Sequence, residues 1–222
     1  MAEIDTTRDQ RCRGRPQVRP DAETRQIIYE AARHEFAASG YAATSMETVA
    51  RRAGVSTKTL YRLVPNKASL FEGMVSDRLD RFLADVNLRA VDHVRIEEAL
   101  YAALMACVEL VLDEEVIALQ RMVLQEAGKS SDIAGIFYRN GVQRTSAALA
   151  DWLRVQKKRG LIALDDVDVA AGMLIGMVAS APQRAAIFGG LPLPSRSQID
   201  ARVRTCARLF LRGCKAKRMS GQ

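Results

Sequence analysis

The sequence predicts an all-α protein, and three observations support this fold class. Apolar residues recur three and four positions apart along most of the 222-residue chain, as they do on one face of a helix. The alternation of apolar and polar residues that marks strands is nearly absent. Glycine and proline are sparse, with 14 and 6 residues. We expect a basic arm over residues 1–20, a three-helix head over 21–66 and a larger helical domain over 67–222.

Composition narrows the class of protein and its setting. The chain is 48% apolar and 27% charged, which is ordinary for a globular protein, and its net charge of +7 favours a polyanionic partner. The four cysteines form no CxxC pair and the chain shows no apolar signal segment, so we expect a reducing, cytoplasmic setting. The longest uncharged run, residues 169–183, contains a proline and is too short to cross a bilayer. No membrane partner is expected.

The first twenty residues are basic and poor in apolar side chains, so we expect them to be disordered in isolation. Within them, Arg13-Gly14-Arg15-Pro16 resembles the core of an AT-hook. In that motif a pair of arginines lies along a narrow minor groove, whose negative potential attracts guanidinium groups. A tail that only increases solubility is the alternative. The position of the motif just before the head favours DNA contact by Arg13 and Arg15.

The first helix is expected from Asp21 to Ser39. Asp21 can cap it, Gly40 ends it, and Tyr41 packs at the corner that follows. Its apolar stripe consists of Ile27, Ile28, Ala31, Ala32 and Phe36. This helix should hold together the two very short helices that come next, because helices of two turns bury too little surface to be stable alone.

Residues 44–67 predict two short helices joined by a tight turn. Thr44 can cap the first helix in a capping box with Glu47, and Gly54 supplies the positive φ that ends it. Ser56 can cap the second, which should run from about Thr57 to Val64 because a proline follows. Two helices that meet over a turn of this kind are a helix-turn-helix, whose second helix enters the major groove of DNA.

The second short helix has two different faces. Leu60, Leu63 and Val64 lie three and four positions apart and should pack inward. The outward residues provide hydroxyl groups, cations and no acid, which suits a surface that meets base edges and phosphates. Those residues are Thr57, Lys58, Thr59, Tyr61 and Arg62. A solvated helix of an ordinary bundle is the alternative for this pattern taken alone.

A longer match is carried by A-A-R-H-E-F-A-A-S-G-Y-A-A-T-S-M-E-T-V-A-R-R-A-G-V-S-T-K-T-L-Y-R, followed by N-K-A-S-L-F. With these segments, the region from Ile27 to Leu70 resembles the DNA-binding domain of the TetR family of bacterial transcriptional regulators. The sequence departs from the family at Leu63-Val64-Pro65, where an aromatic pair is usual. By position, the resemblance implies that Thr57, Lys58 and Thr59, after the cap Ser56, face bases. It also implies that Thr44, Tyr61 and Lys67 hold phosphates.

The larger domain should be a bundle of five or six helices. A long helix is expected from Asn66 to about Ala90, where it links head and body. Later helices are expected over Ile96–Leu112, Val116–Ala127 and Ile133–Arg159, then after Asp165 and Asp166, and last after a capping box of Ser195 with Gln198. The segments L-Q-R-M-V-L-Q-E-A and F-Y-R-N-G are similar to the AefR-like branch of TetR C-terminal domains.

This second resemblance implies that the body receives a small-molecule effector and forms a homodimer through its last two long helices. A two-fold dimer can read two half-sites about one helical turn apart. Small residues such as Gly172 and Gly176 would allow close helix approach, although tight packing within one chain explains them equally well. Apolar and flexible side chains that could line a pocket are Phe82, Met105, Met122, Phe137, Trp152, Met173 and Met177, and most such residues belong to a core.

Nothing in the sequence indicates catalysis, a cofactor or a metal. The two histidines, His34 and His93, lie on different segments without cysteine or carboxylate at metal-ligand spacing, and no catalytic triad or phosphate loop is present. Cys206 and Cys214 leave a thiol sensor as a minor alternative. We expect a DNA-binding repressor that a small molecule releases from its operator. The alternatives are a ligand-independent architectural DNA-binding protein, or a helical enzyme with an incidental head.

Overall fold

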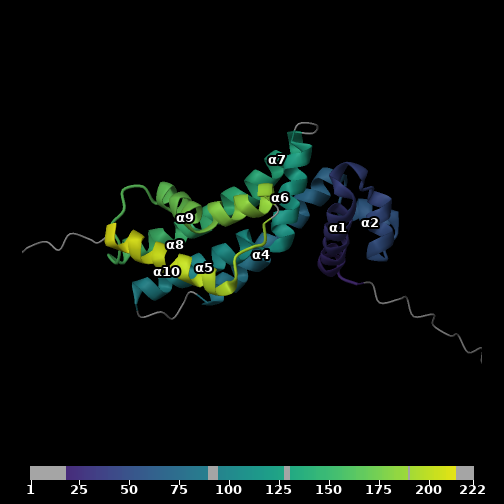
Figure 1. Cartoon of the computed structure of the whole chain (residues 1–222). Coiled ribbons are helices and arrows are strands. Elements are labelled where there is room, and N and C mark those ends of the chain that lie inside the picture. The colour runs from purple at the N-terminus through teal and green to yellow at the C-terminus, as the bar shows by residue number, and fades with distance from the viewer. Residues whose placement is uncertain (1–18, 90–94, 128–130, 190, 214–222) are drawn as a thin grey trace, which may run out of the picture.

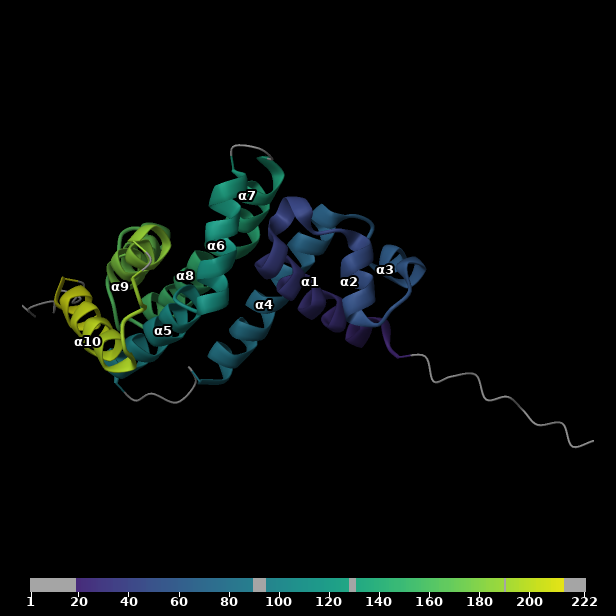
Figure 2. The same ribbon diagram turned by 45° about the vertical axis from the view of Figure 1, so that its right-hand side comes forward.

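The computed structural model describes residues 19–89, 95–127, 131–189 and 191–213, and these residues confirm the all-α fold class. The elements are α1 (Asp21–Ala43), α2 (Met46–Ala53), α3 (Thr57–Leu63), α4 (Lys67–Arg89), α5 (Ile96–Val111), α6 (Glu114–Glu126), α7 (Ser131–Phe137), the π-helical segment η1 (Tyr138–Gln143), α8 (Arg144–Lys158), α9 (Val167–Gly189) and α10 (Arg196–Gly213). Figures 1 and 2 show α1 to α3 as a head at one end and α5, α8, α9 and α10 side by side as a body.

The head is built on a core that α4 shares. The residues of this core are almost inaccessible to solvent; they include Ile28, Ala32, Phe36, Val49, Leu60, Leu70 and Phe71. At its centre the ring of Phe36 stacks on Tyr41 at 5.5 Å, and Phe71 meets both rings edge-on. Because Phe71 belongs to α4, the helix that leaves the head for the body is fixed to the head at its first turns.

The head core also continues into α6 and α7. Met122 and Val123 of α6 and Ile133 and Ile136 of α7 are buried in the same cluster as the α1 to α4 residues. Helix α6 packs directly on α1 (Figure 2). The head is therefore joined to the rest of the molecule by two routes, α4 and the α1–α6 contact.

A second core holds the body together. Helices α5, α8, α9 and α10 bury their apolar faces against one another, with Leu104, Leu153, Leu174 and Val203 fully buried. The predicted capping box that opens α10 is confirmed, since Ser195 N donates to Gln198 Oε1 at 2.9 Å and Gln198 N to Ser195 Oγ at 3.3 Å.

Two predicted caps are wrong. Asp21 makes no side-chain cap, because its carboxylate binds the guanidinium of Arg62 instead. The N-cap of α2 is Ser45 and not Thr44, and the capping box is completed by Thr48 in place of Glu47. Both hydroxyl residues can cap, and the neighbouring fold decides between them. The expected helix end at Gly40 is confirmed, since its φ of 77° interrupts α1 there.

The single helix expected over Ile133–Arg159 is also different in the structure. It consists of α7, η1 and α8 in direct succession, with the wider π-helical turns at Tyr138–Gln143. Gly141 lies in this segment, and a Cβ there would be 3.7 Å from a methyl group of Val75 on α4. This is an ordinary van der Waals distance, so η1 packs against α4 without requiring a glycine at this position. π-Helical turns inside a helix frequently occur at functional sites.

Gly73 marks another close approach, between α4 and α1. A Cβ at Gly73 would lie 2.5 Å from Tyr29 Cζ, well inside van der Waals contact. We predict that Gly73→Ala lowers the free energy of unfolding by about 1–3 kcal/mol, although alanine alone favours a helix. Combining it with Tyr29→Leu should restore most of the loss, as chemical denaturation would measure. Additive losses in the double variant would contradict a direct clash.

Candidate nucleic-acid interface and ligand cavity

Helix α3 presents the outward face that its sequence predicts. Its cap is Ser56, whose Oγ accepts from the Thr59 backbone at 3.0 Å. Leu60 is fully buried against the head, whereas Thr57 and Lys58 are exposed. Thr59 is half-buried, and its hydroxyl is hydrogen-bonded to Ser56 Oγ at 2.8 Å. The side chains of residues 57 and 58 are therefore free to meet a duplex.

The remaining polar groups of α3 are held by acids of the head. Both oxygens of Asp21 accept from Arg62 at 2.8 Å, and this hydrogen bonding lowers the pKa of the Asp21 carboxyl. The Tyr61 hydroxyl donates to Glu47 Oε1 at 3.3 Å. Desolvation, followed by the charge of Glu47, raises the pKa of Tyr61, so the phenol stays protonated and can donate. Arg62 ties α3 to the start of α1.

Two residues for which the sequence suggested phosphate contacts have internal partners in this structure. Thr44 is only 3% exposed, and its hydroxyl donates to the carbonyl oxygens of Gly40 at 2.7 Å and Glu35 at 3.2 Å. The ammonium of Lys67 donates to the carbonyl oxygens of Tyr41, Ala42 and Thr44, at 2.9, 3.1 and 3.0 Å. It also lies 4.7 Å from the centre of the Tyr41 ring. Lys67 therefore ties the last turn of α1 and the residue that follows it to the start of α4.

Asn66, where the long helix was expected to begin, caps α4, since its Oδ1 accepts from the Ser69 backbone at 2.8 Å. The arm arginines Arg13 and Arg15 lie outside the described residues, as do His93 and Cys214. Cys206 and Cys107 are free and buried, and burial raises the pKa of both thiols, for Cys107 to about 12. A thiol with a raised pKa is protonated at neutral pH and reacts slowly.

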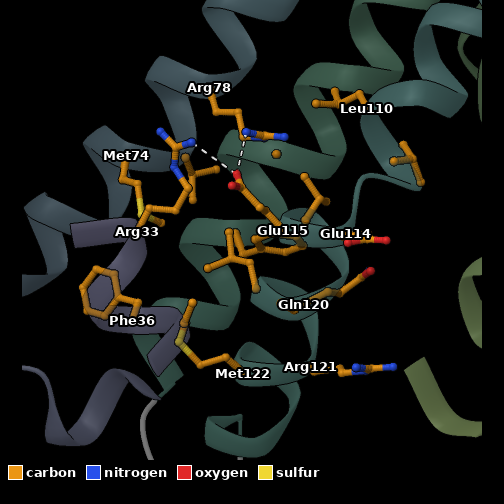
Figure 3. A pocket seen from close by; sticks show the side chains of 18 of the residues that line it. Arg33, Phe36, Met74, Arg78, Leu110, Glu114, Glu115, Gln120, Arg121 and Met122 are labelled. Atoms are coloured by element: carbon orange, nitrogen blue, oxygen red, sulfur yellow. Dashed lines mark hydrogen bonds and ion pairs between the residues drawn. The ribbon is translucent and has the colours of Figure 1, made fainter. Parts of the chain in front are cut away.

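A cavity of about 720 Å³ lies where the head meets the body. Its walls come from α1, from α4 to α7, from η1 and from α8 and α9. Most of the lining is apolar, with Phe36, Met74 and Met122 among the residues. Figure 3 shows these side chains around the opening between α1, α4 and α6. The volume is within the range of small-molecule sites in proteins, roughly 300–1,000 Å³.

An ion cluster lies at one end of this cavity. Glu115 of α6 accepts from Arg33 of α1 at 3.2 Å and from Arg78 of α4 at 2.9 Å, as the dashed lines in Figure 3 mark. Arg33 also pairs with Glu30 at 2.5 Å, and Arg78 with Asp113 at 2.6 Å. Glu115 thus connects the head, the linking helix α4 and the body through one carboxylate.

Sequence reasoning found part of the lining and missed the polar part. Met122 and Phe137 line the cavity, whereas Met173 and Met177 are exposed on α9. Arg33, Arg78 and Glu115 were not singled out, because each looks like an ordinary surface charge of its own helix. The spacing of apolar residues within one helix does not show which charged residues of different helices will come into contact.

Among the described residues, no group of His, Cys, Asp and Glu side chains is arranged to hold a metal ion. In the same ranges no helix combines the length and apolarity needed to cross a membrane.

Family models match both parts of the chain. Residues 28–74 match the model described as bacterial regulatory proteins of the tetR family. Residues 98–214, more than half of the chain, match the model of the AefR-like transcriptional repressor C-terminal domain. The chain belongs to the TetR family. Both resemblances drawn from the sequence are confirmed, and the fold is that of a TetR-family transcriptional regulator.

Solved structures agree with this TetR-family assignment. A TetR-family regulator described as putative, from Mesorhizobium loti MAFF303099, is 26% identical with a TM-score of 0.77, over 90% of this chain and all of that one. The flavonoid-responsive regulator FrrA is 24% identical with a TM-score of 0.68, over 88% and 99%. FadR of Bacillus subtilis, solved with stearoyl-CoA, is 18% identical with a TM-score of 0.64, over 85% and 98%. No curated protein gives a sequence match.

The internal position of Lys67 leads to a stability prediction for this TetR-family protein. Lys67→Met keeps the apolar stem but removes the donor from three carbonyl oxygens. We expect the free energy of unfolding to fall by about 2 kcal/mol. Lys58→Met is the matched control, because Lys58 is exposed on α3 and should change stability by less than about 0.5 kcal/mol. Equal denaturation midpoints for the two variants would exclude the internal role.

Proposed function

We propose that this TetR-family regulator is a homodimeric repressor that binds operator DNA through α3 of both heads and leaves it when a small molecule fills the cavity. The observation that carries the proposal is the position of the cavity. Its lining includes α1 of the head together with α4, α6 and α9, so one ligand can touch the DNA-reading part and the body at once. As a DNA-binding regulator it would act in the cytoplasm.

The DNA-reading residues we propose are Thr57, Lys58 and Thr59 on the exposed start of α3, with Ser56 as its cap. Hydroxyl and ammonium groups at the N-terminal end of a recognition helix can reach base edges in the major groove. The Tyr61 hydroxyl, which is exposed beside Glu47, is proposed to reach a phosphate. Phosphate contacts by Thr44 and Lys67 stay predictions, and in this conformation both residues act as internal supports of the head.

For the arm, we keep the proposal that Arg13 and Arg15 enter a neighbouring minor groove. Its support is the sequence R-G-R-P and its place shortly before α1. Guanidinium groups are attracted to the narrow minor groove of A·T-rich DNA.

The dimer interface we propose lies on α9 and α10. Val169, Met173 and Met177 repeat every four residues on α9 and are 51%, 64% and 40% exposed, so they form an apolar stripe that this chain leaves uncovered. Leu209 on α10 is 56% exposed. Gly172 and Gly176 have no side chains, so a second helix could approach the α9 backbone closely at these positions. An apolar stripe of this kind is expected where a second copy packs against it in a two-fold dimer.

Release by a small molecule is supported by similarity as well as by the cavity. The family model that matches the body is described as that of a repressor, and two structural neighbours are described as flavonoid-responsive or as bound to stearoyl-CoA. In this chain a ligand would bias the position of α4, which is fixed to the head core by Phe71 and lines the cavity through Met74 and Arg78. A conformational equilibrium shifts only if the ligand binds the two states differently.

DNA reading is tested with Lys58→Ala. We expect this variant to change the preference among operator bases, with a loss of about 1–3 kcal/mol at the base that Lys58 contacts. Fluorescence anisotropy with single-base operator variants measures this. Arg154→Ala, on the exposed surface of α8, serves as the control for loss of one positive charge. If the protein binds operator and random duplex equally well, it is an architectural DNA-binding protein and the repressor proposal fails.

The dimer interface is tested with Met173→Glu. A charge in the middle of the α9 stripe should convert the dimer to monomers at micromolar concentration, because it would be buried without a partner. Light scattering after gel filtration reports the mass. Leu124→Glu is the matched control, since Leu124 is 50% exposed on α6, away from the stripe, and should leave the mass unchanged. A dimer that survives Met173→Glu would place the interface elsewhere.

A further inference from the structure

The cavity at the head–body junction contains the polar atoms that lack partners. Within the described ranges, three buried side-chain atoms have no hydrogen-bond partner: Nε of Arg33, Nε of Arg78 and Oε1 of Gln120. All three belong to residues that line the cavity. A buried polar group without a partner costs about 1–3 kcal/mol, so a ligand oxygen that reaches one of these atoms after a small rotation of its side chain gains affinity and orientation. Two of the three atoms are donors, which calls for an acceptor on the ligand.

The charge of the ion cluster limits what that acceptor can be. The guanidinium groups of Arg33 and Arg78 are already paired with three carboxylates, those of Glu30, Asp113 and Glu115. By formal charge the cluster carries −1. The other charges of the lining, Glu114 and Arg121, offset each other. A ligand carboxylate or sulfonate placed at the cluster would add a second uncompensated negative charge there, which is unfavourable.

A cationic ligand meets a different obstacle. The net charge of the cluster attracts a cation, but the unpartnered N–H groups of Arg33 and Arg78 are donors and cannot accept a hydrogen bond from an ammonium group. Among the three buried unpartnered atoms of the described ranges, the acceptor is Gln120 Oε1. The rest of the lining is mostly apolar, with Phe36, Met74 and Leu119 in the walls. An uncharged molecule with an oxygen can accept from the guanidinium groups and leave the carboxylates in place.

We infer that the cavity takes an uncharged, mostly apolar ligand with a hydroxyl or carbonyl oxygen, and that this oxygen is held by Arg33 and Arg78 at the cluster. The inference rests on the proposed function, because it gives the chemical class of the effector at that same cavity. The π-helical segment independently supports this cavity as a functional site, since Gly141 and Val142 of η1 lie in its wall. Arg33 would then donate both to the ligand's oxygen and to Glu115. The Arg33–Glu115 ion pair is a contact between head and body.

The test uses the full-length protein without DNA and an uncharged dye, N-phenyl-1-naphthylamine, whose fluorescence rises in an apolar site. Competitors of equal chain length displace it: 1-decanol, decanoate and decylammonium. We expect 1-decanol to compete at a concentration about tenfold or more below those of the two ions, the effect of one satisfied hydrogen bond to a charged group. Displacement at a lower concentration by decanoate or by decylammonium would overturn the inference.

The variant Glu115→Gln tests whether the selectivity among competitors comes from the charges of the cluster or only from the apolarity of the ligand. The variant removes one carboxylate charge, so decanoate should gain about tenfold relative to 1-decanol, as a carboxylate can then take the place of Glu115 at both arginines. Glu98→Gln is the matched control, because Glu98 is an exposed acid in the first turn of α5 outside the cavity, and the ratio should not change. An equal shift in both variants, or none in Glu115→Gln, would contradict a role of the cluster.

Occupancy of the cavity is checked with Ser146→Phe and Leu119→Trp, two lining residues on different helices. In each variant that retains its helical circular dichroism, dye binding should weaken about tenfold or more. Unchanged dye binding in both folded variants would place the ligand elsewhere and overturn the inference. Operator affinity is measured separately. If 1-decanol binds with the expected selectivity but leaves operator affinity unchanged, the ligand class stands and the release step of the proposed function fails.

Discussion

Helices α2 and α3 have two turns each, too few to stay helical in water without tertiary packing. Their burial against α1 and α4 is the constraint on which the rest of the structure depends. Val49 and Leu60 are fully buried, and the core they enter is closed by Phe36 and Phe71. Because Phe71 lies in α4, the helix that stabilises the DNA-reading unit is also the helix that lines the cavity. Stability of the head and its connection to the body come from the same side chains.

The core of the head is also shared with helices of the body. The head core extends into α6 and α7, so the head is not an independent body joined by a single helix. The contact between α1 and α6 is apolar at Met122 and ionic at Arg33 and Glu115, and the cavity lies beside both. A change at the cavity can reach α3 through α4 or through α1. Packed cores of this kind respond to a ligand by moving between discrete arrangements, because they have little room to deform.

Local chemistry could be predicted wherever neighbours in sequence decide it. Ser56 and Asn66 cap their helices, Gly54 adopts the positive φ that ends α2, and Ser195 with Gln198 forms its capping box. The errors arise where a residue distant in sequence competes. Asp21 binds Arg62, 41 positions away, because a paired guanidinium is a stronger partner than an orphan amide. Thr44 turns inward to the carbonyl oxygen of Glu35, which leaves Ser45 as the cap.

The sequence alone determined the all-α class, the helix-turn-helix and the outward face of α3, since periodicity, caps and turns act over a few residues. Tertiary structure alone decided that Lys67 ties the end of α1 to the start of α4, that η1 interrupts a long helix, and that Arg33, Arg78 and Glu115 meet at a cavity. Those contacts join residues separated by 23 to 82 positions. Such distances close only when the helices pack, and packing depends on the shapes of all the buried faces together.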